Sequence, residues 1–253
     1  MRLGPDGTPQ WAWILEAMGK PPEQFWTDAK GAVYFDSAGL KRIGSDGRTL
    51  AMISDRTAGK TAKWLAVDPK EGTGFYGGDR NTFTNRQPYR QPYLYKYDGK
   101  GSKLWTLWEP DPKKLGSDTP LSLESDSSPR AMDFAPNGDL LVGGWSDGGN
   151  SVFPKQATDM TKPATSAGYG MSPWGMKNAN SLSHLIRIDP KTLETKAHSW
   201  WVCYLPGKNA PNHASIRSLK VMPSGLVAFT GNAATGLIQT PNAFFPPFDE
   251  TST

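Results

Sequence analysis

The feature that most constrains this fold is a hairpin pattern that recurs along the chain. Residues 131–150, AMDFAPNGDLLVGGWSDGGN, contain an alternating apolar run, an Asn-Gly turn and a second apolar run that ends in small residues. The same pattern occurs at 63–78 and 217–231, and a weaker copy occupies 24–37. Apolar alternation with a period of two is typical of β-strands, and Gly-containing turns between two such runs favour hairpins. Each copy is therefore predicted to be a β-hairpin.

A second hairpin follows three of these copies. Residues 40–53, 94–108 and 185–201 each show apolar alternation that resumes after an Asp-centred turn. Two consecutive hairpins build a four-stranded antiparallel sheet, which is the blade of a β-propeller. We therefore predict an all-β fold, a β-propeller of four-stranded antiparallel blades that forms a single domain over residues 1–253. About four blades are visible, at 20–56, 60–110, 127–203, and 214–253 together with 2–16, and a long insertion loop occupies 154–183.

The two ends of the chain each match half a blade. Residues 2–15 match a second hairpin that has no first hairpin before it, and residues 217–240 match a first hairpin with no clear second one. Two interpretations stay open at this point. Either the two ends complete one blade between them and close a small ring, or the chain is part of a larger ring.

Composition and motifs narrow the function classes. The net charge is only +4 and the Lys and Arg residues are scattered, so no nucleic-acid partner is predicted. No stretch approaches the roughly 20 apolar residues that span a bilayer. The single cysteine, Cys203, allows no intrachain disulfide and is expected to be buried. The three histidines lack metal-ligand spacing and no nucleophile elbow or phosphate loop occurs, so no catalytic residue, metal or cofactor is predicted.

The turns of these hairpins resemble a known group of repeats. The segments GPDGTPQW (4–11), GSDGRTL (44–50) and APNGDLLVGG (135–144) are similar to the bacterial β-propeller repeats of the SBBP type, which are related in pattern to PQQ-like blades. The resemblance implies an extracytoplasmic protein, periplasmic or secreted, whose natural N-terminus precedes Met1. Quinone-binding blades carry Ala-x-Asp-x-x-Thr-Gly-x-x-x-Trp, and the nearest match here has Leu193 where that Gly belongs. PQQ is therefore not predicted.

A basic residue stands near the start of three first hairpins: Lys63, Arg130 and Arg217. The first strand of a propeller blade lines the central channel, so we expect these side chains to converge around the axis. Asp126 and His213 each stand four residues before one of them. Converging cations in a partly dry funnel favour an anionic ligand, such as a small molecule or glycan with a carboxylate or phosphate group. The alternative is that these residues form salt bridges and hydrogen bonds between neighbouring blades.

Two loops are candidates for binding a protein partner. Residues 77–95 interleave Arg with aromatic residues, and the insertion at 154–183 contains a Trp within a stretch of low periodicity. Aromatic and Arg side chains are typical of binding hot spots. The alternative is that the aromatic residues pack over the adjacent blade. The residues expected to contact a partner are Arg80, Phe83, Tyr89, Tyr93 and Trp174.

Together these features predict a non-catalytic binding or scaffold protein in an extracytoplasmic assembly, with an anionic small molecule or glycan in the basic funnel. The alternative is a hydrolase or lyase that acts on carbohydrate, with Asp126 and Asp133 as the first carboxylate candidates. Two carboxyl groups roughly 5 to 10 Å apart across a pocket would favour the enzyme. Basic side chains that are already paired with neighbouring blades would favour a scaffold.

Overall fold

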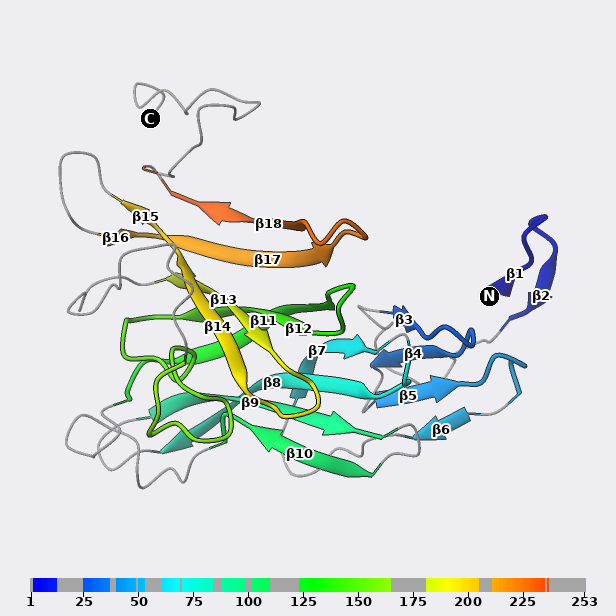
Figure 1. Cartoon of the computed structure of the whole chain (residues 1–253), viewed down its shortest axis with the longest axis horizontal. Coiled ribbons are helices and arrows are strands. Elements are labelled where there is room, and N and C mark those ends of the chain that lie inside the picture. Colours follow the sequence, from blue (N-terminus) through cyan, green and yellow to red (C-terminus); the bar gives the residue numbers. More distant parts are fainter. Residues whose placement is uncertain are drawn as a thin grey trace. The chain divides into compact units, whose positions relative to one another are not determined.

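The computed structural model describes twelve segments of the chain (Figure 1): 2–12, 25–36, 40–48, 50–52, 61–68, 70–83, 88–98, 102–109, 123–164, 181–204, 211–234 and 236. Every regular element in these segments is a β-strand. They accordingly contain no helix that is long and apolar enough to cross a membrane. The chain divides into two compact units, Met1–Gly77 with Leu94–Thr106 and Gly78–Tyr93 with Leu107–Thr253.

Three four-stranded sheets account for most of the strands. In each sheet, strands that are consecutive in the chain are neighbours. The first sheet holds β3 (Phe25–Thr27), β4 (Val33–Asp36), β5 (Leu40–Ile43) and β6 (Leu50–Met52). The second holds β7 (Thr61–Val67), β8 (Gly74–Phe83), β9 (Pro88–Tyr97) and β10 (Lys103–Leu107). The third holds β11 (Ser127–Phe134), β12 (Leu140–Ser146), β13 (Leu182–Ile188) and β14 (Thr195–Trp201).

Three hairpins form two-stranded sheets in the described residues. They pair β1 (Arg2–Leu3) with β2 (Pro9–Trp11), β15 (Cys203–Tyr204) with β16 (Pro211–Asn212), and β17 (Ala214–Val221) with β18 (Val227–Ala233). The all-β class and the four-stranded antiparallel sheets predicted from the repeats are therefore confirmed. Cys203 is fully buried, as expected.

Aspartate side chains build the turns that recur in the sequence. The Oδ1 atoms of Asp28 and Asp68 each accept a hydrogen bond from the backbone N–H two residues later, at 2.9 and 2.8 Å. Asp189 does the same at 2.8 Å, and Asp6 and Asp46 do so in the N-terminal unit. Such a bond satisfies a backbone donor that the sheet leaves unpaired, which is why Asp is preferred in these turns.

Two equivalent turns, 68–73 and 189–194, place different residues in the left-handed conformation. The backbone φ is +70° at Gly72 and +64° at Leu193, and each residue's N–H donates to the backbone oxygen of the aspartate four residues before it. A side chain in this conformation costs about 1 kcal/mol or more. Leu193 is 1% exposed, and burying its side chain offsets that cost. Leu193 therefore adopts a left-handed backbone although it is not a glycine.

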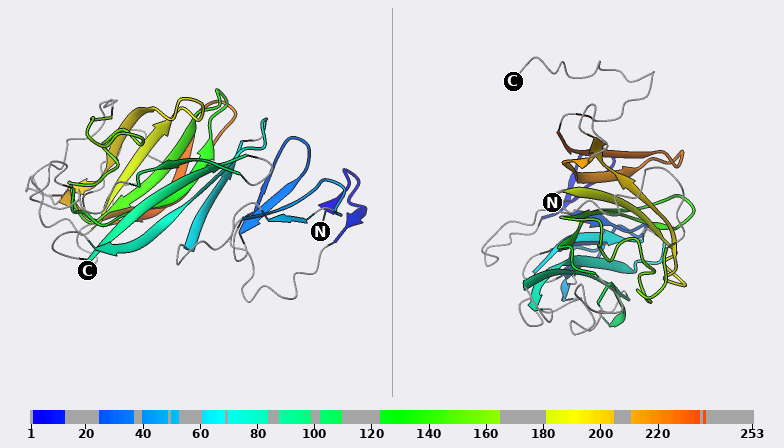
Figure 2. Two further views of the ribbon diagram at one scale, coloured as in Figure 1. Left: turned by 90° about the horizontal axis from the view of Figure 1, so that it is seen from below. Right: turned by 90° about the vertical axis from the view of Figure 1, so that its left-hand side faces the viewer.

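The third sheet packs against the β17–β18 hairpin within the second unit (Figures 1 and 2). Asp133 connects the two, because its Oδ2 accepts a hydrogen bond from the backbone N of Val221 at 2.7 Å and lies 3.0 Å from Lys220 Nζ. The surrounding apolar cluster contains Ala131, Leu141, Ile216, Leu219 and Val221. The carboxylate of Asp133 therefore has a structural role between sheets.

In β12, packing explains why the hairpin ends in small residues. A Cβ on Gly143 would lie 3.0 Å from Ile216, and a Cβ on Gly144 would lie 2.7 Å from the ring of Phe153. The two glycines point to opposite faces of the strand, since side chains alternate along it. Their absent side chains let β17 approach one face and Phe153 approach the other.

Candidate functional site

A pocket of about 470 Å³ lies within the second unit. Its volume is within the range of sites that hold small ligands. Residues of β11, β12, β17 and β18 line it, together with residues just before β13 and β17. The polar and aromatic lining consists of Arg130, Trp145, Ser181, His213, Ser215, Arg217 and Asn232.

Two arginines lie at β-bulges beside this pocket. In the pairing of β11 with β12, the register shifts at Arg130, which is the extra residue of its strand. In the pairing of β17 with β18, the register shifts in the same way at Arg217. A bulge residue is left out of the strand ladder, and the bulge re-aims its side chain. The two hairpins therefore present an arginine from equivalent positions.

The structure brings together three of the five residues expected in a basic funnel. Arg130, His213 and Arg217 line the same pocket. Asp126 is not among the lining residues, and its Oδ1 accepts a hydrogen bond from a backbone N–H of β9 at 2.7 Å. Lys63 belongs to β7, and its side chain lies outside the described residues.

The two bulge arginines lack a balancing charge in the pocket. Burial lowers the pKa of Arg130; the charge of Asp79 acts in the opposite direction, while those of Arg90 and Arg217 lower it further. The Nε of Arg130 is buried and has no hydrogen-bond partner among the described residues. Arg217 is exposed, and its side chain forms no ion pair with another described residue. Since two arginines and no acidic residue line the pocket, its electrostatic potential is expected to be positive.

Trp145 forms the aromatic part of the pocket. Its Nε1–H donates a hydrogen bond to Ser181 Oγ at 2.8 Å, which fixes the orientation of the ring. The guanidinium carbons of Arg130 and Arg90 lie 5.1 and 5.7 Å from the ring centroid. These distances are those of cation–π contacts, so the ring helps to hold the arginine of β11 in place.

Sequence reasoning missed four polar or aromatic lining residues: Trp145, Ser181, Ser215 and Asn232. Ser215 and Asn232 are directly opposite each other in the pairing of β17 with β18. The sequence contained one signal for Ser215. A serine stands two residues before each bulge arginine, in SPR (128–130) and in SIR (215–217). Ser181 and Asn232 carried no such signal, since only the fold brings them to the pocket.

Near this pocket lies a carboxyl pair. The backbone N–H of Asp147 donates to the backbone oxygen of Asp126 at 3.1 Å. Burial raises the pKa of Asp147 to about 6, and the charge of Asp126 contributes in the same direction. Asp133, the other carboxylate candidate, is engaged by β17 instead. Asp147 is thus the carboxyl group in this region whose proton can be exchanged near neutral pH.

The structure places the expected partner-binding residues of β8 and β9 largely inside the protein. Tyr89 and Tyr93 are 1% and 0% exposed. Arg80 is partly buried and forms an ion pair with Glu109. Packing within the unit, the alternative interpretation, agrees with this burial. The side chain of Phe83 and all of Trp174 lie outside the described residues.

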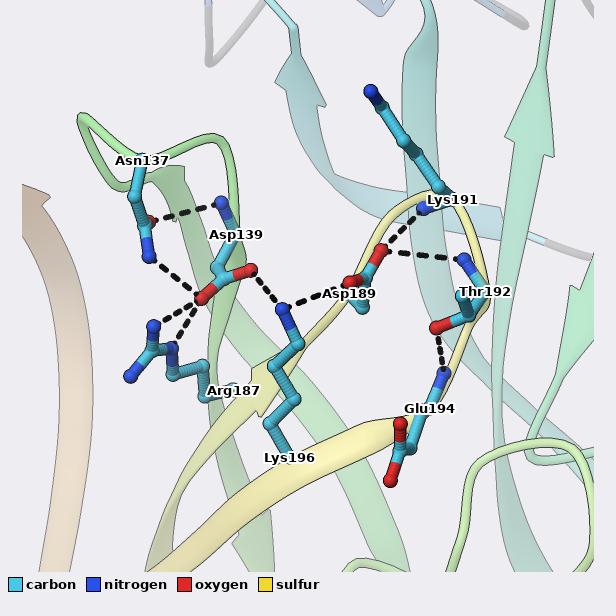
Figure 3. Close-up of polar contacts among 8 residues, drawn as sticks. All are labelled: Asn137, Asp139, Arg187, Asp189, Lys191, Thr192, Glu194 and Lys196. Atoms are coloured by element: carbon cyan, nitrogen blue, oxygen red, sulfur yellow. Dashed lines mark hydrogen bonds and ion pairs between the residues drawn. The ribbon is translucent and has the colours of Figure 1, made fainter.

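A polar cluster at the other turn of β12 contains cations that are fully compensated (Figure 3). Asp139 accepts hydrogen bonds from Asn137 Nδ2 at 2.9 Å, from Lys196 Nζ at 2.9 Å and from the guanidinium of Arg187. Lys196 Nζ also lies 2.8 Å from Asp189 Oδ2. Burial acts to raise the pKa of Asp139, but the hydrogen bonds from its three partners lower it overall. The cluster joins the two turns and leaves no charge for a ligand.

A smaller pocket of about 190 Å³ lies in the first unit, and charged side chains that line it are paired with one another. The Nε of Arg42 donates to Tyr34 Oη at 3.1 Å, and Arg42 lies 4.0 Å from Asp28. The lining contains both acidic and basic residues. This arrangement is that of a structural contact between turns.

Two histidines form a buried hydrogen-bonded chain in the third sheet. Ser146 Oγ lies 2.7 Å from His184 Nε2, and His184 Nδ1 lies 3.0 Å from His198 Nε2. Ser146 donates its own proton to the backbone oxygen of Gly148. The lowered pKa values of both rings favour their neutral forms, in which His184 donates through Nε2 and accepts from His198 through Nδ1. Burial lowers the pKa of His184 far below its usual value and that of His198 to about 4.

The described residues contain no group of three or more His, Cys, Asp or Glu side chains that could hold a metal ion. Searches of the whole sequence against protein-family models and against curated proteins give no match. The chemistry of the pocket is therefore the basis for assigning a function. Its cations, neutral hydrogen-bonding groups and single aromatic ring suit the binding of a small anionic molecule.

Proposed function

We propose that this chain is a β-propeller of the SBBP-like type that acts as a binding or scaffold protein in an extracytoplasmic assembly. We further propose that it binds an anionic small molecule or glycan at the pocket of Arg130 and Arg217. The repeated four-stranded sheets support the propeller. The likeness of the turn segments to extracytoplasmic repeats supports the compartment.

One observation carries the binding function: two bulge arginines line one pocket whose lining contains no acidic residue. Two cations held near one another repel, and this repulsion contributes to the lowered pKa of Arg130. An anion that enters the pocket replaces the repulsion with charge-assisted hydrogen bonds. Each such bond contributes about 1.5 to 3 kcal/mol.

The test is a binding titration by calorimetry with acidic and neutral monosaccharides and with inorganic phosphate. We expect acidic ligands to bind and their affinity to fall as salt rises, because the attraction is electrostatic. Arg130→Gln and Arg217→Gln should each weaken binding about tenfold or more. Lys191→Gln removes the same charge from an exposed turn outside the pocket and should leave the affinity unchanged. Equal affinity in Arg217→Gln and Lys191→Gln would contradict the proposal.

The carboxyl pair of Asp126 and Asp147 favours a second candidate function, a hydrolase or lyase that acts on an acidic carbohydrate. A carboxyl group with a pKa of about 6 can serve as a general acid near neutral pH. The test is product formation from oligosaccharides that bind the pocket. Asp147→Asn should abolish turnover while retaining binding. Bound oligosaccharides that remain intact on prolonged incubation would exclude this candidate.

A further inference from the structure

The lining of the pocket has a basic part and a neutral hydrogen-bonding part. The basic part consists of the bulge arginines, Arg130 and Arg217. The neutral part includes Ser215 of β17 and Asn232 of β18, which are directly opposite each other in the strand pairing. Hydroxyl and amide groups can both donate and accept hydrogen bonds. Paired groups of this kind match the hydroxyls of a sugar, each of which also donates and accepts.

The charge around the pocket suits a ligand with an anionic group. Asp79 attracts Arg130 and offsets part of its charge. Asp79 is itself positioned by Ser128, whose Oγ–H donates to it at 2.7 Å. Arg217 has no such partner among the described residues. A carboxylate carries one charge, whereas a phosphate monoester carries about −1.5 to −2 near neutral pH. Asp79 also forms an ion pair with Arg90, at 3.8 Å, so it does not neutralise Arg130 alone. Either anion can accept charge-assisted hydrogen bonds from the arginines, and the experiment below compares the two.

Trp145 adds an apolar surface between these polar groups. Its indole N–H is occupied by Ser181, so it does not compete for the ligand's oxygens. The ring is partly exposed and lines the pocket. Aromatic rings contribute apolar contact area to small-molecule sites, while a few polar groups set the orientation of the ligand. A pyranose ring has both an apolar C–H face and a rim of hydroxyls.

On the basis of the anion site proposed above, we infer that the ligand is a sugar that carries a carboxylate, of the uronic acid type. Its carboxylate binds Arg130 and Arg217, its hydroxyls bind Ser215 and Asn232, and its ring lies against Trp145. This assignment gives a role to the arginines, the tryptophan, Ser215 and Asn232 of the lining. It also separates the roles of β11, which contributes charge, and β18, which contributes hydroxyl recognition.

The experiment compares probes that differ in one group at a time. The methyl glycosides of glucuronate, galacturonate and mannuronate carry both ring and carboxylate. Methyl glucoside, methyl galactoside and methyl mannoside lack the carboxylate, and acetate lacks the ring. We expect at least one uronate to bind at least about tenfold more tightly than its neutral counterpart, which is the effect of one charge-assisted hydrogen bond. Acetate should likewise bind at least about tenfold more weakly than that uronate.

A matched pair of variants separates the two parts of the lining. Arg217→Gln should reduce the affinity for the uronate and for acetate alike. Asn232→Ala should reduce the affinity for the uronate about two- to tenfold, as expected for a lost neutral hydrogen bond, and leave that for acetate unchanged. Both positions are exposed, so neither change should alter folding, and thermal unfolding checks this.

The outcomes distinguish this inference from the proposed anion site. Tighter binding of inorganic phosphate or glucose 6-phosphate than of any uronate would overturn the carboxylated sugar and retain the anion site. An Asn232→Ala variant with unchanged uronate affinity would also overturn it. If none of the anions binds, both the anion site and the sugar assignment fail.

Discussion

Arg187 and Lys196 lie against the buried carboxylate of Asp139, whereas Arg130 and Arg217 line a pocket that contains no carboxylate. Both groups lie in the second unit, but the first draws its cations from the hairpin of β13 and β14 and the second draws them from β11 and β17. The first group is compensated within the protein, whereas the lining of the second group's pocket contains no acidic residue. The presence of basic residues therefore does not identify a site, and the position of the nearest acid does.

A β-bulge alone does not distinguish the pocket arginines from the compensated cluster. The pairing of β13 with β14 shifts register beside Arg187, which leaves Lys196 as the extra residue of β14. Lys196 is thus presented by a bulge, like Arg130 and Arg217. It meets Asp139 and Asp189 because the turns before β12 and after β13 each provide an acid (Figure 3). No acidic residue lines the pocket of Arg130 and Arg217.

Acidic pH should lower the free energy of unfolding of the third sheet, which carries the compensated cluster. This is the largest effect we expect. The pKa of His198 is about 4 in the folded protein and about 6.5 when unfolded. Its stabilisation is therefore complete above pH 6.5 and is lost as the pH falls toward 4, by about 3 kcal/mol. His184, on β13, contributes in the same direction because its pKa is also lowered.

The measurement is the free energy of urea unfolding between pH 7 and 4. Asp147 contributes to the pH dependence of stability with the opposite sign, because its raised pKa makes its protonation stabilising. The contribution of His198 is therefore isolated by comparing the wild type with His198→Gln. Gln retains an N–H donor for His184 and does not titrate. The variant should lose less stability on acidification than the wild type. Parallel pH profiles for the two proteins would show that this histidine is not buried as a neutral ring.

Removing the carboxylate of Asp139 should have the next largest effect. Asp139→Asn leaves Arg187 and Lys196 without their shared acceptor, and the side chain of Asp139 is 4% exposed. We expect a loss of about 2 kcal/mol in the free energy of unfolding, measured in urea. The matched control is Asp159→Asn in an exposed pair with Lys162, which should change the free energy of unfolding much less because solvent screens the pair. Equal effects of the two changes would remove the distinction between a compensated cluster and an ordinary surface pair.

The turn beside that cluster can be altered without touching its charges. Gly138 has φ +90°, and no atom lies within 4 Å of the position that a Cβ would take there, so Gly138→Ala tests backbone conformation alone. We expect a loss of about 1 kcal/mol in thermal or urea unfolding. Gly225, at the corresponding turn between β17 and β18, has φ +85° and equally open surroundings, so Gly225→Ala should match it. A much larger loss for Gly138→Ala would mean that the turn holds the ion-pair cluster in place.

The smallest effect on stability should come from the pocket. Arg217 is exposed and uncompensated, so Arg217→Gln should change the free energy of unfolding by less than about 0.5 kcal/mol. Arg187→Gln removes the same charge from the compensated cluster and should cost more. A pocket variant as destabilising as the cluster variant would indicate that the pocket arginines have a structural role.

The sequence by itself determined the local structure. Strand alternation repeats every two residues, and the turn aspartates bond to N–H groups only two to four residues away, so both are visible along the chain. Alignment of the repeats also placed Arg130 and Arg217 at equivalent positions, because each stands near the start of a first hairpin. These inferences depend on neighbours in the chain, and the structure agrees with them.

Only the tertiary structure decided which polar groups are satisfied. The partner of Ser128 is Asp79, 49 residues away, and the turn carboxylate of Asp139 meets Lys196, 57 residues away. The burial of Tyr89 and the arrival of Asn232 at the pocket likewise depend on which strands pack together. Charge compensation is set by distances of a few ångströms between residues far apart in sequence. A repeat pattern predicts where such residues stand on their strands, but packing determines which of them meet.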